Sequence, residues 1–266
     1  MRDTVKTEEY FRERYNEDAY YLAERMSKYE EVISHPEKYN VWSFKYQTYM
    51  EAACKFYAGY SLGLGMNELL PEVDLIIRNL IDAIKERDSG YDDMALIIYL
   101  IILFNRTEFL DEYKELLIKS EYWDVYLENL IQILDPTWKI STEELCCPKY
   151  TNAVSVYEVV VLSKENKAEA VQRLKRYLKR QWFMSLTEGV ITNRDLKIGW
   201  YRGYWCVAAA ALVKALKLDD TELKDCKYYP YDMAHFCSGL IRKIGKLHSV
   251  VSEAVWHQYK QYKITA

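Results

Sequence analysis

Glycine and proline are scarce in this chain, which has nine and five of them in 266 residues. So few residues that break helices argue against a structure built on tight turns and loops. Apolar residues instead recur at helical spacings of three and four positions along nearly the whole sequence. We therefore expect an all-α fold, in the form of a compact multi-helix bundle.

Long hydrophobic runs are also absent. The most apolar run, residues 94–104, is well short of the roughly 18 residues that a membrane-spanning helix needs. The N-terminus shows no apolar core of signal-peptide length. The six cysteines form no Cys-x-x-Cys motif and no dense disulfide framework. We expect a cytoplasmic protein without membrane contact and with reduced thiols, although the adjacent Cys146 and Cys147 leave a regulatory thiol open.

Motifs of catalysis and metal binding are missing too. The four histidines, at 35, 235, 248 and 257, form no His-Glu-x-x-His motif and have no acidic partner at a metal-site spacing. The sequence contains no Gly-x-Ser-x-Gly elbow, no Walker-type loop and no Gly-x-Gly-x-x-Gly element after a strand. We expect no enzymatic activity, no metal and no cofactor.

Two features of the composition bear on possible partners: the formal net charge is mildly negative, at −4, and 25 residues are tyrosine, an unusually high number. The negative charge argues against direct nucleic-acid binding and suits a partner with a basic cleft, although it is also ordinary for a cytosolic protein. A tyrosine ring is apolar while its hydroxyl needs a partner, so tyrosine suits half-buried positions and interfaces. Packing between helices is the preferred explanation for the tyrosines, with a contact surface as the alternative.

Caps, glycines and prolines divide the predicted helices into two lobes. We expect an N-terminal lobe at 1–134, a C-terminal lobe at 149–240 and a tail at 241–266 that adds an amphipathic helix. The connecting stretch, 135–148, holds two prolines and the cysteine pair. The bundle is therefore expected to have two helical lobes with a boundary near residue 140.

A buried helix rich in alanine is predicted from Tyr201 to Leu216. No charge occurs between Arg202 and Lys214, and a helix that is apolar on all sides is buried. We expect the rest of the chain to pack around it, and the stretch before it, 187–197, to be a loop. Another helix, starting after Ser163, carries an outward basic face: Lys167, Arg173, Lys175, Arg176, Lys179 and Arg180. We prefer a solvated helix face to a nucleic-acid contact there, because no aromatic platform is interleaved with the charges.

Three ordered blocks give the C-terminal part a family resemblance. They are Gly203-Tyr204-Trp205 running into the alanines, Leu218-Asp219-Asp220, and Tyr228-Tyr229-Pro230-Tyr231-Asp232. These blocks resemble the signature of the PoNi immunity proteins, cytoplasmic antidotes to polymorphic DNase effectors, including effectors delivered by type VI secretion. The resemblance is strongest over 177–233 and looser before it, where Tyr57-Ala58-Gly59-Tyr60-Ser61 is similar to the family's N-terminal half.

The chain departs from the family pattern at two places. Ala208 stands where family members usually carry a glutamate, and the stretch 190–195 lacks the histidine that tends to precede the Gly-Tyr-Trp block. If those polar residues recognise the partner, this chain is a divergent or inactive member. If they pack in the core, a repacked core is sufficient.

The resemblance implies inhibition of a cognate nuclease toxin by tight binding, without turnover. Acidic and aromatic groups would block the basic cleft of a nuclease. Chosen by charge, and for one residue by its exposed ring, the candidate contacts are Tyr91, Asp92, Asp93, Glu143, Glu144, Asp219 and Asp220. The signature residues are expected to be structural: Gly203, Tyr204, Trp205, Tyr228, Tyr229, Pro230 and Asp232.

Other interpretations stay open. The pairs Asp92-Asp93 and Asp219-Asp220 also fit helix caps. An α-helical adaptor could bind peptides in tyrosine-rich grooves, and an enzyme could use carboxylates that face one another inside a lobe. A homodimer is also open.

Overall fold

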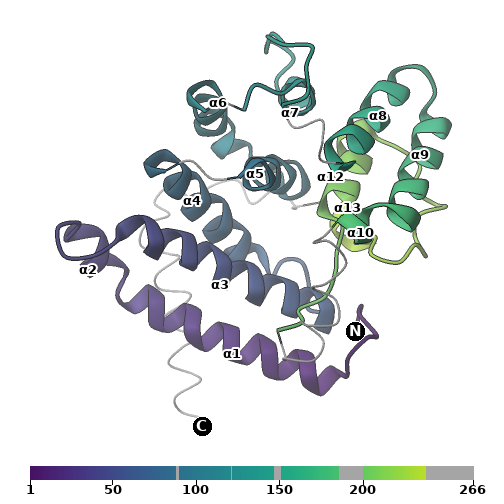
Figure 1. Ribbon diagram of the computed structural model, residues 1–266. Helices are drawn as coiled ribbons and strands as arrows, with labels where there is room; N and C mark the ends of the chain where they lie inside the picture. Colours follow the sequence, from purple (N-terminus) through teal and green to yellow (C-terminus); the bar gives the residue numbers. More distant parts are fainter. Residues whose placement is uncertain (88–89, 121, 147–150, 186–199, 238–266) are drawn as a thin grey trace. The chain divides into compact units, whose positions relative to one another are not determined.

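The computed structural model describes residues 1–87, 90–120, 122–146, 151–185 and 200–237 (Figure 1). These residues contain twelve α-helices, one 3-10 helix and no β-strand, so the predicted all-α class is confirmed. The contacts divide the chain into two compact units between Arg87 and Asp88. The expected loop at 187–197 and the expected helical tail at 241–266 lie outside the described residues.

The first unit contains three long helices and a short one: α1 (Glu8–Ser27), α2 (Tyr29–Ser34), α3 (Val41–Leu62) and α4 (Leu70–Glu86). α3 packs against both α1 and α4 (Figure 1). The side chains of Thr7 and Asn40 accept hydrogen bonds from the first-turn amides of α1 and α3. Two of the long helices therefore begin where a capping side chain stands in the sequence.

The end of α3 is closed by the first residues of the chain. Gly63 follows the helix with a φ of 101°, a left-handed conformation that favours glycine. A side chain at Gly63 would also meet the backbone nitrogen of Met1, which lies 2.8 Å from the ideal Cβ position. The Arg2 guanidinium donates to the carbonyls of Tyr60 and Leu64. Arg2 thus holds the N-terminal residues to the last turn of α3 and to the connection that follows it.

The second unit contains the remaining described elements: α5 (Tyr91–Phe104), η1 (Thr107–Phe109), α6 (Leu110–Lys119), α7 (Val125–Leu134), α8 (Thr151–Glu165), α9 (Lys167–Arg180), α10 (Trp182–Ser185), α12 (Val207–Leu216) and α13 (Tyr231–Ala234). α5 contacts α6, α7 and α12, and α12 also packs on α8 (Figure 1). α8 and α9 form an α-hairpin. The apolar run 94–104 therefore lies inside this unit.

The alanine-rich helix is buried as expected, but it begins later. α12 starts at Val207, whereas the apolar spacing predicts a start at Tyr201. Gly203 has a φ of 105°, and the amide of Cys206 donates to the carbonyl of Tyr228 (2.8 Å). Because this long-range bond and the left-handed glycine replace helical geometry, residues 201–206 are not helical.

The stretch expected to separate two lobes, 135–148, falls inside the second unit as far as it is described. The unit boundary and the predicted lobe boundary therefore stand at different places in the chain. Lys214, at the end of α12, contributes to the cohesion of the second unit, since its ammonium donates to the carbonyls of Leu103 and Phe236.

Candidate functional site

A buried aspartate joins three segments of the second unit. Asp124 precedes α7, and its Oδ1 accepts hydrogen bonds from the amide of Leu127 (3.0 Å) and the hydroxyl of Tyr91 (3.1 Å). Its Oδ2 accepts from the amide of Cys146 (2.8 Å). Burial raises the pKa of Asp124, and these hydrogen bonds oppose the rise. One carboxylate thus caps α7 and holds it to the start of α5 and to the chain at Cys146.

The stretch 135–146 runs back along α7 and is bonded to it. The buried carboxylate of Glu128 accepts hydrogen bonds from the amide (2.5 Å) and the hydroxyl (2.6 Å) of Ser141. The amide of Val125 donates to the carbonyl of Glu144 (2.9 Å). These bonds fix a stretch that has no helix or strand of its own.

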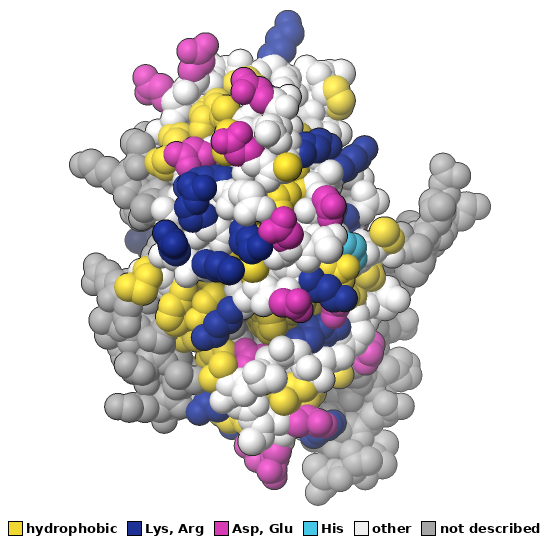
Figure 2. All heavy atoms as spheres, turned by 90° about the vertical axis from the view of Figure 1, so that its right-hand side faces the viewer, with side chains coloured by type: hydrophobic (Ala, Val, Ile, Leu, Met, Phe, Trp, Pro, Cys, Tyr) yellow, Lys and Arg dark blue, Asp and Glu magenta, His cyan; other side chains and the backbone are white. Residues whose placement is uncertain are grey.

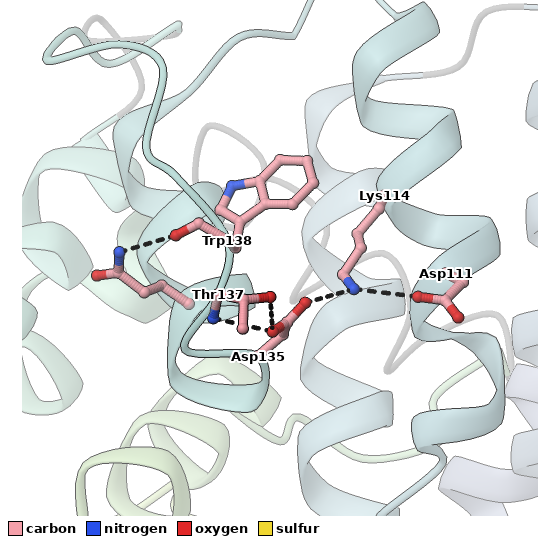
Figure 3. A network of polar contacts seen from close by, with 6 residues as sticks. Asp111, Lys114, Asp135, Thr137 and Trp138 are labelled. Carbon is pink, nitrogen blue, oxygen red and sulfur yellow. Dashed lines mark hydrogen bonds and ion pairs between the residues drawn. The ribbon is translucent and has the colours of Figure 1, made fainter.

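Figure 3 shows how this stretch begins. The Lys114 ammonium on α6 lies 2.7 Å from a carboxylate oxygen of Asp135 and 3.0 Å from one of Asp111. The other Asp135 oxygen accepts from the amide and hydroxyl of Thr137. These bonds, first from Lys114 and then from Thr137, lower the pKa of Asp135 to about 2. The turn after α7 is therefore attached to α6.

Two of the predicted acidic pairs, Asp92-Asp93 and Glu143-Glu144, therefore belong to segments that are both bonded to the start of α7. Asp92, Glu143 and Glu144 are exposed, and Asp93 is half-buried. The indole of Trp123, next to Asp124, is 43% exposed. We call the surface formed by Asp92, Asp93, Trp123, Glu143 and Glu144 the acidic corner.

Tyr91 does not belong to this surface, although the sequence led us to expect an exposed tyrosine. Its side chain is only 9% exposed, its hydroxyl bonds Asp124, and its ring meets the edge of Tyr122 at 6.4 Å. Burial raises the pKa of its hydroxyl. The expectation of exposure was wrong, because the first residue of α5 turns inward toward a buried acceptor. Tyr91 instead links the start of α5 to Asp124 through a buried hydrogen bond.

The third predicted acidic pair lies after α12 and has other partners. Asp220 is buried and accepts a 2.5 Å hydrogen bond from the hydroxyl of Tyr229, and His235 Nε2 lies 3.3 Å from its other oxygen. Asp219 is exposed and accepts bonds from the hydroxyl and amide of Thr221, which lower its pKa. The following residues form turns, with no helix for the pair to cap.

The signature blocks form a framework. Phe183 stacks on Tyr228 with ring centroids 4.8 Å apart, and Tyr204 meets the edge of Phe183 at 5.5 Å. Tyr228 has a φ of 71° and accepts the Cys206 bond that precedes α12. Residues distant in the sequence are thus joined through rings and one backbone bond.

The remaining signature residues stand around α13. Tyr229 bonds the buried Asp220, and Pro230 is the residue just before the helix. Asp232 lies in the first turn and is exposed, and Trp205 is half-buried before α12. Tyr204, Tyr228 and Tyr229 thus contact other residues of the second unit, and the structural role expected for the signature stays a prediction.

Sequence reasoning missed the residues that assemble the corner, Asp124 and Glu128, and the exposed Trp123. An aspartate before the apolar run of α7 is a readable cap signal. Its tertiary partners were not readable, since Tyr91 and Cys146 lie 33 and 22 positions away. Only the fold brings these residues together.

The described residues show no apparatus for metal chemistry: none of their His, Cys, Asp and Glu side chains form a group of three that could hold a metal ion. Over the same residues, no helix has both the length and the apolar character needed to cross a bilayer.

Residues 122–233 match the family model described as PoNe immunity proteins (PoNi), C-terminal. The resemblance to this family is therefore confirmed over that segment. The matched segment includes Trp123, Asp124, the Glu143-Glu144 pair and all three signature blocks. It begins at residue 122, before residue 149, where we expected the C-terminal lobe to start. No curated protein and no solved structure matches the chain.

Proposed function

We propose that this chain is an immunity protein that neutralises a cognate DNase toxin by binding it directly in the cytoplasm. The observation that carries the proposal is the match of residues 122–233 to PoNe immunity proteins. A toxin that cuts chromosomal DNA acts where that DNA is, so its inhibitor is needed in the same compartment. Delivery of the toxin by type VI secretion is part of this proposal.

The acidic corner is the proposed contact surface. A nuclease binds DNA through a basic cleft, because phosphate contacts supply most of the affinity for nucleic acid. The carboxylates of Asp92, Glu143 and Glu144 offer charge of the sign that such a cleft attracts. Trp123 adds a partly exposed indole, a side chain enriched among residues that dominate binding energy. Buried bonds to Asp124 and Glu128 hold these groups before the partner arrives, which lowers the entropic cost of binding.

The proposed role is inhibition by occupancy, with no catalytic turnover and no cofactor. The chain would bind the toxin and leave DNA uncontacted. Asp219 remains a candidate contact because it is exposed, whereas Asp220 and Tyr91 are buried and would act through the framework. A homodimer remains a prediction.

The adaptor alternative has less support. It requires tyrosine-rich grooves, but the side chains of Tyr60, Tyr113, Tyr126 and Tyr177 are fully buried. Rings inside the core give helix packing rather than a surface for peptides.

Co-expression tests the proposal. The cognate nuclease, sought first among the products of the adjacent genes, is induced with or without this chain, and survival and chromosomal DNA integrity are measured. We expect survival and intact DNA only when the chain is present, and a stable complex on size-exclusion chromatography with the catalytically inactive nuclease. Loss of viability despite full expression of the folded chain contradicts the proposal.

A charge-reversal variant tests the corner. We expect D92K/E143K/E144K to fold and to lose protection. The matched control E8K/E37K/E115K reverses three exposed carboxylates, which pair with Arg12, His35 and Lys119. Such exposed contacts contribute little to stability, so the control should protect like the wild type. Equal protection by both variants would remove the corner from the contact surface and leave the immunity role standing.

A further inference from the structure

The outward face of α9 is divided into neutralised and unneutralised cations. Arg173 pairs with Glu158 (2.5 Å), and Lys175 pairs with Glu222 (2.6 Å). Arg176, Lys179 and Arg180 are exposed and form no ion pair within the ranges that the structure describes. Their spacing of three and four positions places them on one helix face. Three neighbouring positive charges repel one another, and negative charges on a bound partner would offset this repulsion.

An aromatic cluster adjoins this end of α9. Tyr204 contacts Phe183 (5.5 Å) and Tyr201 (4.9 Å), and Trp182 packs on Tyr228 (5.0 Å). A fourth cation lies here, because the Lys227 ammonium is 4.8 Å from the centroid of the Tyr228 ring. The basic end of α9 therefore borders this packed aromatic cluster.

Two large apolar side chains project next to this cluster. Met184 is 67% exposed and Trp200 is 68% exposed, the highest exposed fractions among the large hydrophobic side chains of the described residues. Met184 follows Phe183, and Trp200 precedes Tyr201, so each is one residue from a ring that packs on Tyr204. Neither side chain is needed to fill the core.

Figure 2 looks onto the right-hand side of Figure 1, where α9 lies, and shows Lys and Arg side chains with hydrophobic side chains beside them and Asp and Glu side chains among them. We name the following six residues the basic aromatic surface: Arg176, Lys179, Arg180, Met184, Trp200 and Lys227. Arginine, tryptophan and methionine are enriched in protein interfaces. All six residues lie within the segment that matches the immunity family.

We propose that the basic aromatic surface is a second contact surface for the toxin, on which an apolar side chain flanked by carboxylates of the toxin docks. This inference rests on the proposed function and extends it, because the acidic corner accounts only for the toxin's basic cleft. Trp200 and Met184 contact the toxin's apolar side chain, and Arg176, Lys179 and Arg180 pair with its carboxylates.

The composition of the surface favours a protein partner over a nucleic acid. The unpaired cations are few, and carboxylates of Glu158, Glu169 and Glu222 lie on or beside α9. The whole chain carries a net charge of −4, which repels phosphate backbones at long range. A short basic patch with apolar anchors matches an acidic protein surface better than an extended polyanion.

The test uses the full chain and a catalytically inactive form of the nuclease that the co-expression experiment identifies. R176E/K179E/R180E and W200A/M184A are compared with the wild type by biolayer interferometry, and circular dichroism melts confirm folding. The control K28E/K38E/K119E makes the same change in net charge at exposed lysines elsewhere. We expect each test variant to raise Kd by at least about tenfold, as at interface hot spots, and the control to stay within about twofold.

The outcomes separate this inference from the proposed function. Wild-type affinity in both folded test variants, together with weakened binding by D92K/E143K/E144K, overturns the second surface and leaves the immunity role intact. Failure of the wild-type chain to bind the nuclease overturns the proposed function itself. Duplex DNA binding that R176E/K179E/R180E abolishes, with nuclease affinity unchanged, assigns the surface to nucleic acid and also overturns the inference.

Discussion

Two buried aspartates in the second unit each accept a hydrogen bond from a tyrosine hydroxyl, yet their surroundings differ in what reaches the surface. Asp124 binds Tyr91 and leaves the nearby carboxylates of Asp92, Glu143 and Glu144 exposed. Asp220 binds Tyr229 and is itself one of the acidic residues that looked available in the sequence. The same hydrogen bond therefore leaves neighbouring carboxylates exposed at Asp124, whereas at Asp220 it buries one of the predicted contact carboxylates.

This difference shows why charge alone selects contact residues poorly. In this unit the acidic residues stay exposed where a separate aspartate accepts the buried hydrogen bonds. At the acidic corner Asp124 accepts them, and the carboxylates of Asp92, Glu143 and Glu144 are exposed. After α12, the side chain of Asp220 contacts Tyr229 and His235, and neither is a third acidic residue. Asp220, itself a member of the acidic pair, therefore accepts the buried hydrogen bond.

Removing Asp124 is expected to have the largest effect. Asp124→Ala deletes the cap of α7 and leaves the Tyr91 hydroxyl and the Cys146 amide without their acceptor in the protein interior. We expect about 3 kcal/mol of lost stability by urea denaturation, from cap loss plus unsatisfied buried donors. Asp111→Ala, a highly exposed control, should cost less than about 0.5 kcal/mol. Near wild-type stability of D124A would mean that Asp124 does not hold the corner together.

Removing the hydrogen bond between Tyr229 and Asp220 should destabilise the protein less than removing Asp124, and it should not change binding of the nuclease. Tyr229→Phe leaves a buried carboxylate short of one donor, and we expect a loss of about 1.5 kcal/mol in urea denaturation. Tyr39→Phe removes a similar bond to the exposed Glu31 and should change stability by less than about 0.5 kcal/mol. We expect nuclease affinity to stay unchanged in folded Y229F. A tenfold weaker complex would place Tyr229 in the contact surface.

The smallest expected effect is the dependence on pH of the bond that attaches the 135–146 stretch. Because the pKa of Asp135 is lowered to about 2 from an ordinary 3.8, its contribution is present above pH 4 and disappears as the pH falls toward 2. Lys114→Ala should therefore reduce stability most above pH 4, and the difference from the wild type should narrow toward pH 2. Urea denaturation at several pH values measures this.

Lys119→Ala is the matched control, since its ion pair with Glu115 is exposed. It should show a small difference at every pH. A difference between K114A and the wild type that is constant from pH 2 to 5 would contradict the assigned role of Asp135.

Much of the fold was predictable from local signals. Thr7 and Asn40 cap helices where the sequence places them, and the apolar run 94–104 lies inside the second unit as its composition indicates. The start of α12 was not predictable, because apolar spacing continues through 201–206 while a left-handed Gly203 and a bond to Tyr228 exclude helix. Spacing reports which face is apolar, and it cannot report a tertiary hydrogen bond.

The candidate site was predictable in part. The acidic pairs at 92 and 143 were identified by charge, and their location on one corner came only from the bonds of Asp124. The exposure of Tyr91 was predicted wrongly, since a sequence does not show that an acceptor waits in the interior. The signature blocks identified a family before any contact was known, and their residues lie within the segment that matches the family model.

The acidic corner is the surface that we propose binds the basic cleft of the nuclease. The most direct measurement is the affinity of the wild type and of D92K/E143K/E144K for the inactive nuclease across a range of salt concentrations. We predict that the wild-type association rate falls as salt rises, and that the variant binds at least about 100-fold more weakly with a flatter salt dependence. Wild-type affinity and an unchanged salt dependence in the folded variant would contradict the account.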